Sequence, residues 1–565
     1  MSRGPEADAA DGAPPEPTGT RIGLAIGLGA ALAATLPVLA NGLVWDDIYL
    51  ISDFDRLGDG HHLGAAITSP FWENSAYMGL PPAPYWRPLT SLCLWLGRAV
   101  FGQSSAGFHA LSLLSLAAAS LAFFVLIRRV LLQQRDRAGA AWVALVFAVH
   151  PLGAEVLCMV GNLSDHLAFA LIALEIVLFV NVLRGRLDPR FAITAGAILG
   201  FLACAAKEIG VVSALSPLAA LLLLRAAGTE PLRRSTLPAL FAASIVPVAA
   251  FVALRVEVLG AEAAFPGIAG LPLAAFMAFG QSLLRAIAPL ETGACVSVAT
   301  RDPVALAPGV IGLGLLAVAA YGAVRIARRP TFQLVGLLVA LALLLPSLLT
   351  VVPAGGQILI PTRYLHLPLA GLLLAALPAF SRRGHLVQRI APLAVIMLAL
   401  LSFVRVREWR DSLSFWTAER DHDPGSMLAA ANLAVALVGM RSFDAAEDVL
   451  DATEAMPGLS ASYRAHASSV RADIARERDH DLERASTFLV KALTLTPNNL
   501  DYVLSLADAR AAAGRADQAV IVLEKARTAP WFDGRQKAVV TEHLTRFREA
   551  AGGKSRTHPA SNHVD

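Results

Sequence analysis

The chain has 565 residues, of which 56% are hydrophobic and 16% charged, and its mean hydropathy is +0.57. A soluble globular protein carries about 25% charged residues, so a wholly soluble protein is excluded, as are disordered, collagen-like and disulfide-stapled chains. The formal net charge of +3 lacks the concentrated basic face that nucleic-acid binding requires.

The charged residues divide the chain into two parts. Residues 1–404 contain 47 of the Asp, Glu, Lys and Arg residues, and residues 405–565 contain the other 44. The first part is therefore about 12% charged, whereas the second is about 27% charged, which is the usual soluble value. We predict an all-α protein with a multi-spanning membrane domain at 21–404 and a water-soluble helical domain at 405–548, flanked by disordered tails at 1–20 and 549–565.

Eleven apolar runs are long enough to cross about 30 Å of hydrocarbon. The run 22–43 has no small-residue cleavage site before Trp45, so it predicts an anchor and not a removed signal peptide. Two shorter or interrupted stretches, 88–101 and 272–290, are predicted to be interfacial or re-entrant. The remaining ten runs are 106–127, 139–159, 166–183, 191–206, 209–226, 237–258, 303–324, 331–352, 364–380 and 390–404.

Five loops between these runs are rich in arginine, and short arginine-rich loops stay in the cytoplasm. Placing all five inside puts the N-terminus in the cytoplasm and the helical domain outside it. Abundant arginine and alanine suggest a GC-rich bacterial genome. We therefore predict that the protein is located in the bacterial inner membrane. The five clusters are Arg128, Arg129, Arg135 and Arg137; Arg184, Arg186 and Arg190; Arg225, Arg233 and Arg234; Arg325, Arg328 and Arg329; and Arg382, Arg383 and Arg389.

The soluble part repeats itself. Ala485, Leu489, Ala492 and Pro497 recur 34 residues later as Ala519, Leu523, Ala526 and Pro530, and Ala445, Val449, Ala452 and Pro457 precede them by 40. The period of 34 is that of tetratricopeptide (TPR) repeats, in which small residues let paired helices pack closely. We predict three TPR repeats, with an insertion of about six residues near 476–481; an unrelated helical bundle is the alternative.

Ionisable residues that lie outside the arginine clusters gather on the outer side of this topology. Charged residues at membrane depth are expensive and are candidates for function. They are Asp46 and Asp47; His150, Glu155 and Asp165; Lys207 and Glu208; and Arg363, which is followed by Tyr364. Because several separate loops supply them, we predict a single site on that face.

Each group also has an ordinary interpretation. Trp45 with Asp46 and Asp47 fits an interfacial aromatic residue beside two solvated acids, and the His150 group could hydrogen-bond internally between helices. Lys207–Glu208 fits an interfacial pair, and a lone interfacial arginine such as Arg363 is common. Together, however, they suit transfer of a group from a phosphate to a hydroxyl: a carboxylate activates the nucleophile, while lysine and arginine hold the departing charge.

Five motifs in order carry a resemblance. They are Trp45-Asp46-Asp47, Tyr85-Trp86-Arg87-Pro88-Leu89-Thr90, His150-Pro151 with Glu155 and Asp165, Ala206-Lys207-Glu208, and Arg363-Tyr364-Leu365-His366-Leu367-Pro368. With the repeats, they resemble the transmembrane-and-TPR protein O-mannosyltransferases and their bacterial relatives, which are polyprenyl-phosphate-dependent glycosyltransferases of the GT-C type. The chain departs from this family at Thr362, where an acid is common, at Trp86, which is additional, and at Asn162–Ser164, where an arginine usually precedes the acid.

The resemblance implies an inverting hexosyltransferase that uses a polyprenyl-phosphate sugar, often mannose. Asp46 and Asp47 would be the catalytic pair, supported by His150, Glu155, Asp165 and Glu208. Lys207, Arg363 and Tyr364 would bind the donor phosphate, and Arg87 would position substrate. The acceptor would be a Ser or Thr hydroxyl of an exported protein held by the TPR domain.

Alternatives remain at this point. The enzyme could instead modify a cell-envelope glycan or lipid, or the chain could be a non-catalytic TPR scaffold or a transporter. A transporter should show internal symmetry and charges near the bilayer midplane, neither of which the sequence reveals. Which of Asp46 and Asp47 is the base, and whether a metal takes part, stay open; no cofactor beyond the donor lipid is predicted.

Overall fold

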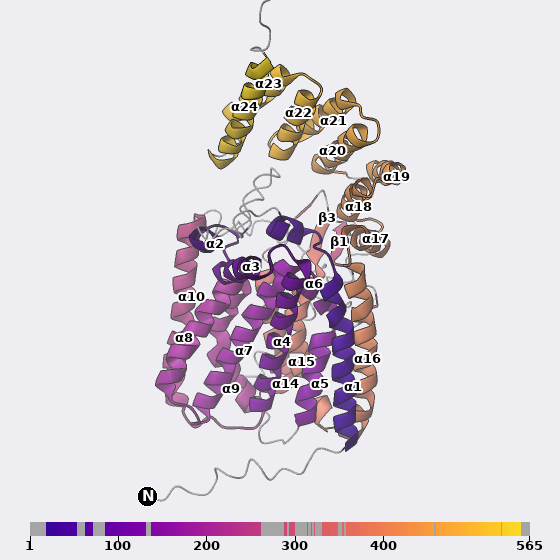
Figure 1. The fold of residues 1–565 in the computed structure, drawn as a ribbon. Coiled ribbons are helices and arrows are strands. Elements are labelled where there is room, and N and C mark those ends of the chain that lie inside the picture. The colour runs from indigo at the N-terminus through magenta and orange to yellow at the C-terminus, as the bar shows by residue number, and fades with distance from the viewer. Residues whose placement is uncertain are drawn as a thin grey trace, which may run out of the picture. The chain divides into compact units, whose positions relative to one another are not determined.

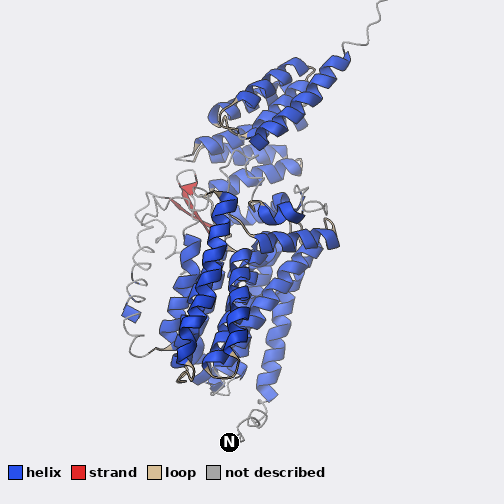
Figure 2. Ribbon diagram, turned by 90° about the vertical axis from the view of Figure 1, so that its left-hand side faces the viewer, coloured by secondary structure: helices blue, strands red, loops and turns tan. Residues whose placement is uncertain are grey.

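The computed structural model is predominantly helical (Figures 1 and 2). It describes residues 18–52, 63–71, 85–130, 137–260, 330–348, 357–382, 384–456, 459–532 and 534–554, together with short pieces between 288 and 354. The chain forms two compact units: the first ends at Asp411, and the second comprises Ser412–Asp565 together with the short internal segments Trp72–Pro84 and Pro353–Gln357. The predicted domain boundary at 404 lies within the last membrane helix, which continues to Glu408.

The first unit is a bundle of upright helices (Figure 1). Its elements in chain order are α1 (Thr18–Thr35), η1 (Leu36–Ala40), η2 (Ile48–Ser52), α2 (Leu63–Thr68), α3 (Pro88–Phe101), α4 (Ser105–Val130), α5 (Arg137–Val149), α6 (Leu152–Cys158), η6 (Val160–Asn162), α7 (Leu163–Leu183), α8 (Pro189–Ala206), η7 (Glu208–Leu215), α9 (Ser216–Ala226), η8 (Arg234–Thr236), α10 (Leu237–Leu259), β1 (Cys295–Ala299), α14 (Phe332–Leu348), β3 (Gln357–Pro361), η10 (Thr362–Leu365), α15 (His366–Arg382) and α16 (Gly384–Glu408). The short strand β2 (Pro353–Ala354) is grouped with the second unit, and the three strands pair in the order β1-β3-β2.

Seven helical segments among the described residues are long and apolar enough to cross a membrane, which indicates a membrane protein. An eighth is added if the bent pair α5–α6 counts as one span. The predicted count of eleven is therefore not confirmed. The predicted run 331–352 corresponds to α14, which is shorter, and most of 303–324 and 272–290 lies outside the described residues.

The bend between α5 and α6 follows directly from the sequence. The two helices meet at 62° across His150-Pro151. Proline has no N–H to continue the α5 ladder, so the chain breaks there. The His150 and Pro151 carbonyls instead accept hydrogen bonds from Gly153 and Ala154, which begin α6. This break places α6, with Glu155 in its first turn, inside the bundle.

Small residues let the membrane helices approach closely. A β-carbon on Gly336 of α14 would lie 2.4 Å from the Gly371 carbonyl oxygen of α15, and one on Gly371 would lie 2.3 Å from the Ala340 nitrogen. Only glycine permits this contact. Since lipid chains are as apolar as leucine, close backbone packing of this kind is a main source of helix association in membranes.

The second unit is a series of helices that pack in consecutive pairs (Figure 1). They are α17 (Ser412–His422), α18 (Met427–Gly439), α19 (Phe443–Glu454), α20 (Ala461–Glu477), α21 (Leu482–Leu495), α22 (Leu500–Ala512), α23 (Ala516–Thr528) and α24 (Gly534–Lys554). The last helix includes the first six residues, 549–554, of the predicted tail. Several of these helices begin with an N-cap residue. The side chains of Ser426, Ser460 and Asn499 each accept a hydrogen bond from a backbone N–H in the first turn of α18, α20 and α22.

The repeat register needs one correction. In α21 and α23 the predicted residues are buried, as Ala485, Leu489 and Ala492 illustrate. In α19, however, the buried positions are Ala446, Leu450 and Thr453, and Ala445 is exposed. The first step is thus 39 residues and not 40. The extra length lies partly in α20, which has 17 residues where α18 and α22 have 13.

Candidate functional site

Asp47 is anchored at the start of a helix. It is fully buried, and its carboxylate oxygens accept the N–H of Val160 (N···O 2.6 Å) and the N–H of Gly161 (3.0 Å) at the break before α7. Burial raises the pKa of Asp47 to about 7; the two N–H groups oppose this shift, and neighbouring Asp46 adds to it. The side chain therefore joins the loop after α1 to the α6–α7 break.

Asp46 differs from Asp47 although the two are adjacent. No described residue donates a hydrogen bond to its partly buried carboxylate, which instead lies within electrostatic range of Arg363 and Arg87. Burial raises the pKa of Asp46 above its ordinary value, and the two arginines pull it down. Trp45, immediately before, has a left-handed backbone with φ of +56°. For a bulky residue this conformation is strained and is found mostly where function requires it.

Arg87 makes a two-pronged ion pair with Glu208. Its Nη2 lies 2.8 Å and its Nε 3.0 Å from Glu208 Oε2, and the guanidinium also stacks on the rings of Tyr85 (4.6 Å) and Phe71 (5.1 Å). The additional tryptophan supports this arrangement, since Trp86 Nε1–H donates to the Ile67 carbonyl at 2.8 Å. Arg87 is thus held from three sides at the start of α3.

Lys207 forms a second buried pair, with Asp165. Their side chains are only 9% and 6% exposed. Lys207 occupies the extended residue between α8 and η7, while Asp165 is in the first turn of α7. The Thr90 hydroxyl donates to the Ala206 carbonyl at 2.7 Å, which ties α3 to the same end of α8.

Arg363 forms a third pair, with Glu155. Arg363 Nη1 lies 2.6 Å from Glu155 Oε1, and the Arg363 backbone N–H donates to Oε2 at 2.7 Å. Thr362, which stands where the resembled family often has an acid, donates its hydroxyl to the same oxygen at 2.9 Å. Glu155 therefore has three donors arranged by η10, and the acid that Thr362 replaces would repel it.

These pairs form one electrostatic neighbourhood, called here the ionic cluster. Arg87 interacts with Asp165 as well as Glu208, Lys207 interacts with Arg87 and Arg363, and Tyr85 interacts with Tyr364 and Arg363. Burial raises the pKa of the Tyr85 phenol to about 12, so this group stays protonated. The structure thus brings together the predicted residues from all five motifs. Within this cluster each cation is paired with a carboxylate, so the acids and the bases do not occupy separate sides of the site.

His150 belongs to a neighbouring group of buried histidines. His366, two residues after Tyr364, has a ring centroid 5.3 Å from that of His166 and 4.4 Å from that of Phe147. His150 Nδ1 lies 3.3 Å from the Leu152 nitrogen at the α5–α6 break. Sequence reasoning noted His150 and missed the other two, although His366 stands inside the Arg-Tyr-Leu-His motif.

Sequence reasoning also missed Glu175, in the middle of α7. This carboxylate is fully buried and accepts hydroxyl hydrogen bonds from Ser216 of α9 and Ser244 of α10, both at 2.8 Å. Contrary to the sequence analysis, an ionisable residue therefore does lie near the middle of a span. Its two serine donors join three helices, which is the bonding expected of a structural tie in a bundle.

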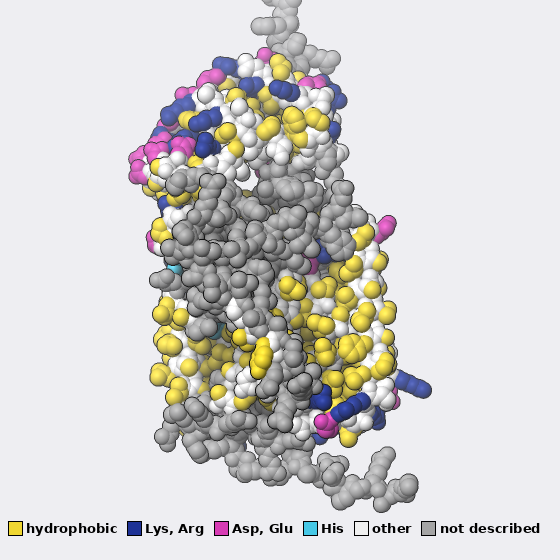
Figure 3. Space-filling model, turned by 180° about the vertical axis from the view of Figure 1, so that it is seen from behind, with side chains coloured by type: hydrophobic (Ala, Val, Ile, Leu, Met, Phe, Trp, Pro, Cys, Tyr) yellow, Lys and Arg dark blue, Asp and Glu magenta, His cyan; other side chains and the backbone are white. Residues whose placement is uncertain are grey.

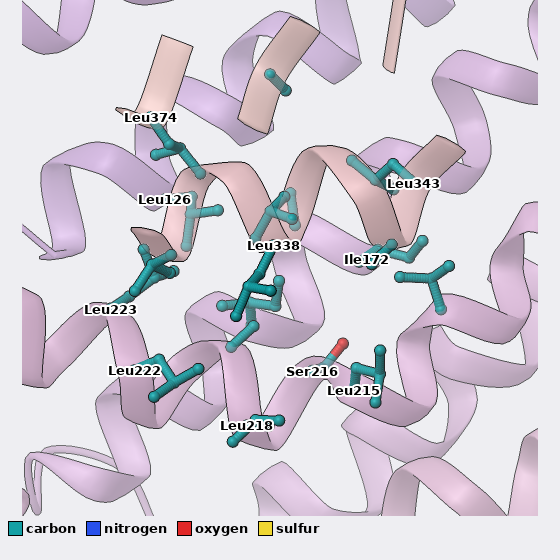
Figure 4. Close-up of a pocket in the computed structure, with 18 of the residues that line it drawn as sticks. Leu126, Ile172, Leu215, Ser216, Leu218, Leu222, Leu223, Leu338, Leu343 and Leu374 are labelled. Carbon is teal, nitrogen blue, oxygen red and sulfur yellow. The ribbon is translucent and has the colours of Figure 1, made fainter. Parts of the chain in front are cut away.

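An apolar cavity of about 340 Å³ lies between α4, α7, η7, α9, α14 and α15 (Figure 4). Its walls are almost entirely leucine, isoleucine, valine, alanine and phenylalanine; Ser216 is an exception. Three elements supply a residue near the cluster and, four positions later, a residue of the cavity wall. These are Asp165 and Phe169 on α7, Glu208 and Val212 on η7, and His366 and Ala370 on α15.

The site was compared with known proteins. No protein-family model matches the chain, and neither a curated protein nor a solved structure matches it. Within the described ranges, no group of three or more His, Cys, Asp or Glu side chains is arranged to hold a metal ion.

Proposed function

We propose that this protein is a membrane glycosyltransferase that moves a sugar from a polyprenyl phosphate to a hydroxyl group. The observation that carries the proposal is Asp46, a carboxylate that accepts no hydrogen bond from the described residues and lies within electrostatic range of Arg363 and Arg87. A general base needs this position: it must reach the nucleophile and be held near, but not neutralised by, the cations that stabilise the leaving group.

The cavity supports a lipid-linked donor. Four residues of α-helix rise about 6 Å, so Phe169 and Ala370 lie one turn below Asp165 and His366. A donor with its phosphate at the ionic cluster would then place the first part of its hydrocarbon chain in a slot that has almost no polar wall. A water-soluble nucleotide sugar would make no use of that slot.

In the proposed reaction Asp46 accepts the proton of the acceptor hydroxyl. The hydroxyl oxygen attacks the anomeric carbon of the sugar from the face opposite the phosphate. The bond between that carbon and the phosphate oxygen breaks, its electron pair leaves with the polyprenyl phosphate, and the configuration inverts. Arg363, Lys207 and Tyr364 surround the departing phosphate, and Arg87 positions the sugar side. Asp47, bonded to two backbone N–H groups, holds Asp46 in place and is not the base.

The three carboxylates that pair with the cations keep them fixed before substrate binds. Glu155, Asp165 and Glu208 hold Arg363, Lys207 and Arg87 at defined positions in a dry environment. A preorganised cation needs no rearrangement when charge develops on the leaving group. On this proposal Glu155, Asp165 and Glu208 are supporting residues, and His150 acts through the α5–α6 break that presents Glu155.

The proposal includes the finer architecture and location. We infer a GT-C-like domain of eleven spans in the bacterial inner membrane, with a cytoplasmic N-terminus and the ionic cluster facing outward, on the evidence of the arginine-rich loops. The helix pairs α18–α19, α20–α21 and α22–α23 would be three TPR repeats that present an exported protein's Ser or Thr to the site.

The test is transfer of label from polyprenyl-phosphate mannose to membrane extract by the purified full-length chain. Asp46→Asn should reduce transfer by a factor of about 10² to 10⁴, the usual contribution of a general base. Asp47→Asn should reduce thermal stability as well as transfer, and Arg363→Ala should weaken donor binding. Asp508→Asn in the second unit is the matched control and should leave transfer unchanged.

Wild-type transfer by Asp46→Asn would overturn the assignment of the base. Label in glycan or lipid instead of protein would identify the envelope-modifying alternative. No transfer from any polyprenyl-phosphate sugar by the wild-type protein would favour the scaffold.

A further inference from the structure

The end of the membrane bundle away from the ionic cluster has a built surface of its own. The loop after α7 and the loop after α9 are joined there, since the Leu232 nitrogen donates to the Leu183 carbonyl at 2.8 Å and Arg233 Nη1 donates to the Leu187 carbonyl at 3.3 Å. The buried Arg184 side chain links these two loops to the end of α4, because it donates hydrogen bonds to the carbonyls of Arg129 and Val130. Three loop or helix ends thus form one platform.

Positive charge on this platform is not balanced within the described part of the chain. Arg129, Arg186 and Arg190 are exposed, and no ion pair there engages them. The nearby acid Asp188 is the N-cap residue of α8, and its carboxylate accepts a hydrogen bond from the backbone N–H of Arg190 at 2.7 Å. Burial, together with repulsion from Arg186 and Arg129, lowers the pKa of Arg184 to about 10. Arg129, whose carbonyl accepts from Arg184, and Arg186 therefore both lie close to the buried Arg184 guanidinium.

Exposed apolar side chains lie among these arginines. Leu232, in the loop after α9, is 79% exposed, and Phe191, at the start of α8, is 60% exposed. In Figure 3, lysine and arginine side chains gather at this end of the described helices, next to a broad hydrophobic surface. Arginines beside exposed apolar groups at a helix end are suited to the head-group layer of a bilayer.

We propose that Arg129 and Arg186, backed by Arg190, bind the phosphate of an acidic phospholipid in the leaflet opposite the transfer site. Guanidinium groups bind phosphate oxygens through paired N–H donors, and basic pockets between helices at the cytoplasmic face recognise anionic lipid head groups. The site is about 27 Å from Asp165 along α7, from 18 residues at 1.5 Å each. It is independent of the proposed transferase activity.

The experiment uses the full-length protein in detergent, titrated with phosphatidylglycerol, with phosphatidylcholine and with inorganic phosphate. Binding is measured by native mass spectrometry and by the thermal unfolding midpoint. Phosphatidylglycerol should bind and raise the midpoint, and the other two should not. Arg129→Gln with Arg186→Gln should weaken phosphatidylglycerol binding about thirtyfold, because each arginine near an anionic surface contributes about fivefold.

The matched control is Arg484→Gln with Arg515→Gln, which removes two exposed arginines from the second unit and should leave lipid binding unchanged. Equal phosphatidylglycerol binding by the wild type and by the Arg129/Arg186 variant would overturn the proposal. So would an equal effect of inorganic phosphate, which would indicate an anion site without lipid selectivity. Because both substituted side chains are exposed, the variant should fold, and its unfolding midpoint in phosphatidylcholine checks that it does.

Discussion

The same kind of contact occurs in two regions of this protein with opposite consequences. In the ionic cluster, Arg363 and Glu155 are 14% and 2% exposed; in the helical second unit, Arg546 of α24 and Asp508 of α22 are 58% and 54% exposed. The distances between paired atoms are similar, 2.6 Å and 2.9 Å. The difference in exposure decides what each pair can do, because water screens the second and not the first.

In a buried ion pair, each charged side chain depends on its partner to compensate its charge. Removing one partner leaves an uncompensated charge in a dry site, whereas an exposed pair leaves only two solvated side chains. The ionic cluster is therefore intolerant of single changes whether or not it is catalytic. A loss of activity in a variant of the ionic cluster is therefore to be compared with that variant's loss of stability.

The largest effect on stability should come from splitting the buried pair. Arg363→Ala should lower the free energy of unfolding by about 3–5 kcal/mol, because the Glu155 carboxylate would remain buried without its cation. Adding Glu155→Gln to the same protein should restore part of the loss. Thermal unfolding of the two single variants and the double variant measures this coupling. Purely additive losses would show that the pair is not energetically linked.

Next in size is the tie in the middle of the bundle. Glu175→Leu should lower the free energy of unfolding by about 2–3 kcal/mol, since it leaves the hydroxyls of Ser216 and Ser244 without their acceptor. Glu175→Gln keeps an acceptor oxygen and should cost less than half as much. Transfer activity should change little in either variant once folded. Loss of activity in fully folded Glu175→Gln would contradict a structural role.

A smaller effect depends on pH and concerns Asp47. Its pKa is about 7 in the folded protein and 3.8 in the unfolded chain, so between these values the folded state binds the extra proton. Stability should therefore fall as pH rises from about 4 to about 7 and then level off. Asp47→Asn should remove this slope from the thermal unfolding midpoint. An unchanged slope in that variant would place its origin elsewhere.

The smallest effect is expected in the second unit. Asp508→Asn removes the exposed partner of Arg546 and should change the free energy of unfolding by no more than about 0.5 kcal/mol. The change should decrease further in 1 M salt, where screening acts over about 3 Å. A loss comparable to that of Arg363→Ala would remove the contrast between the two regions.

The sequence was sufficient to predict that loops far apart in the chain supply one ionic cluster, because the arginine-rich loops determine which ends of the spans share a face. It could not predict the pairing, since Glu155 and Arg363 are 208 residues apart and either could have met another partner. Glu175 was missed because a single acid barely alters a long apolar run. The first repeat was misaligned by one residue where Ala445 and Ala446 are chemically identical neighbours, and only burial distinguishes them.

Every charged member of the three pairs lies at or near a helix end. Arg87 precedes α3, Lys207 follows α8, Glu208 begins η7, Asp165 and Glu155 lie in the first turns of α7 and α6, and Arg363 lies in η10. This has a consequence for biogenesis. The insertion machinery receives apolar segments whose charges lie at their edges, where they carry little penalty, so the ionic cluster need not exist before the helices assemble. Glu175 is different, since an acid near the centre of a span adds about 2.5–3.5 kcal/mol to insertion. We expect α7 to depend on α9 and α10, whose serines satisfy that acid, for stable integration into the bilayer.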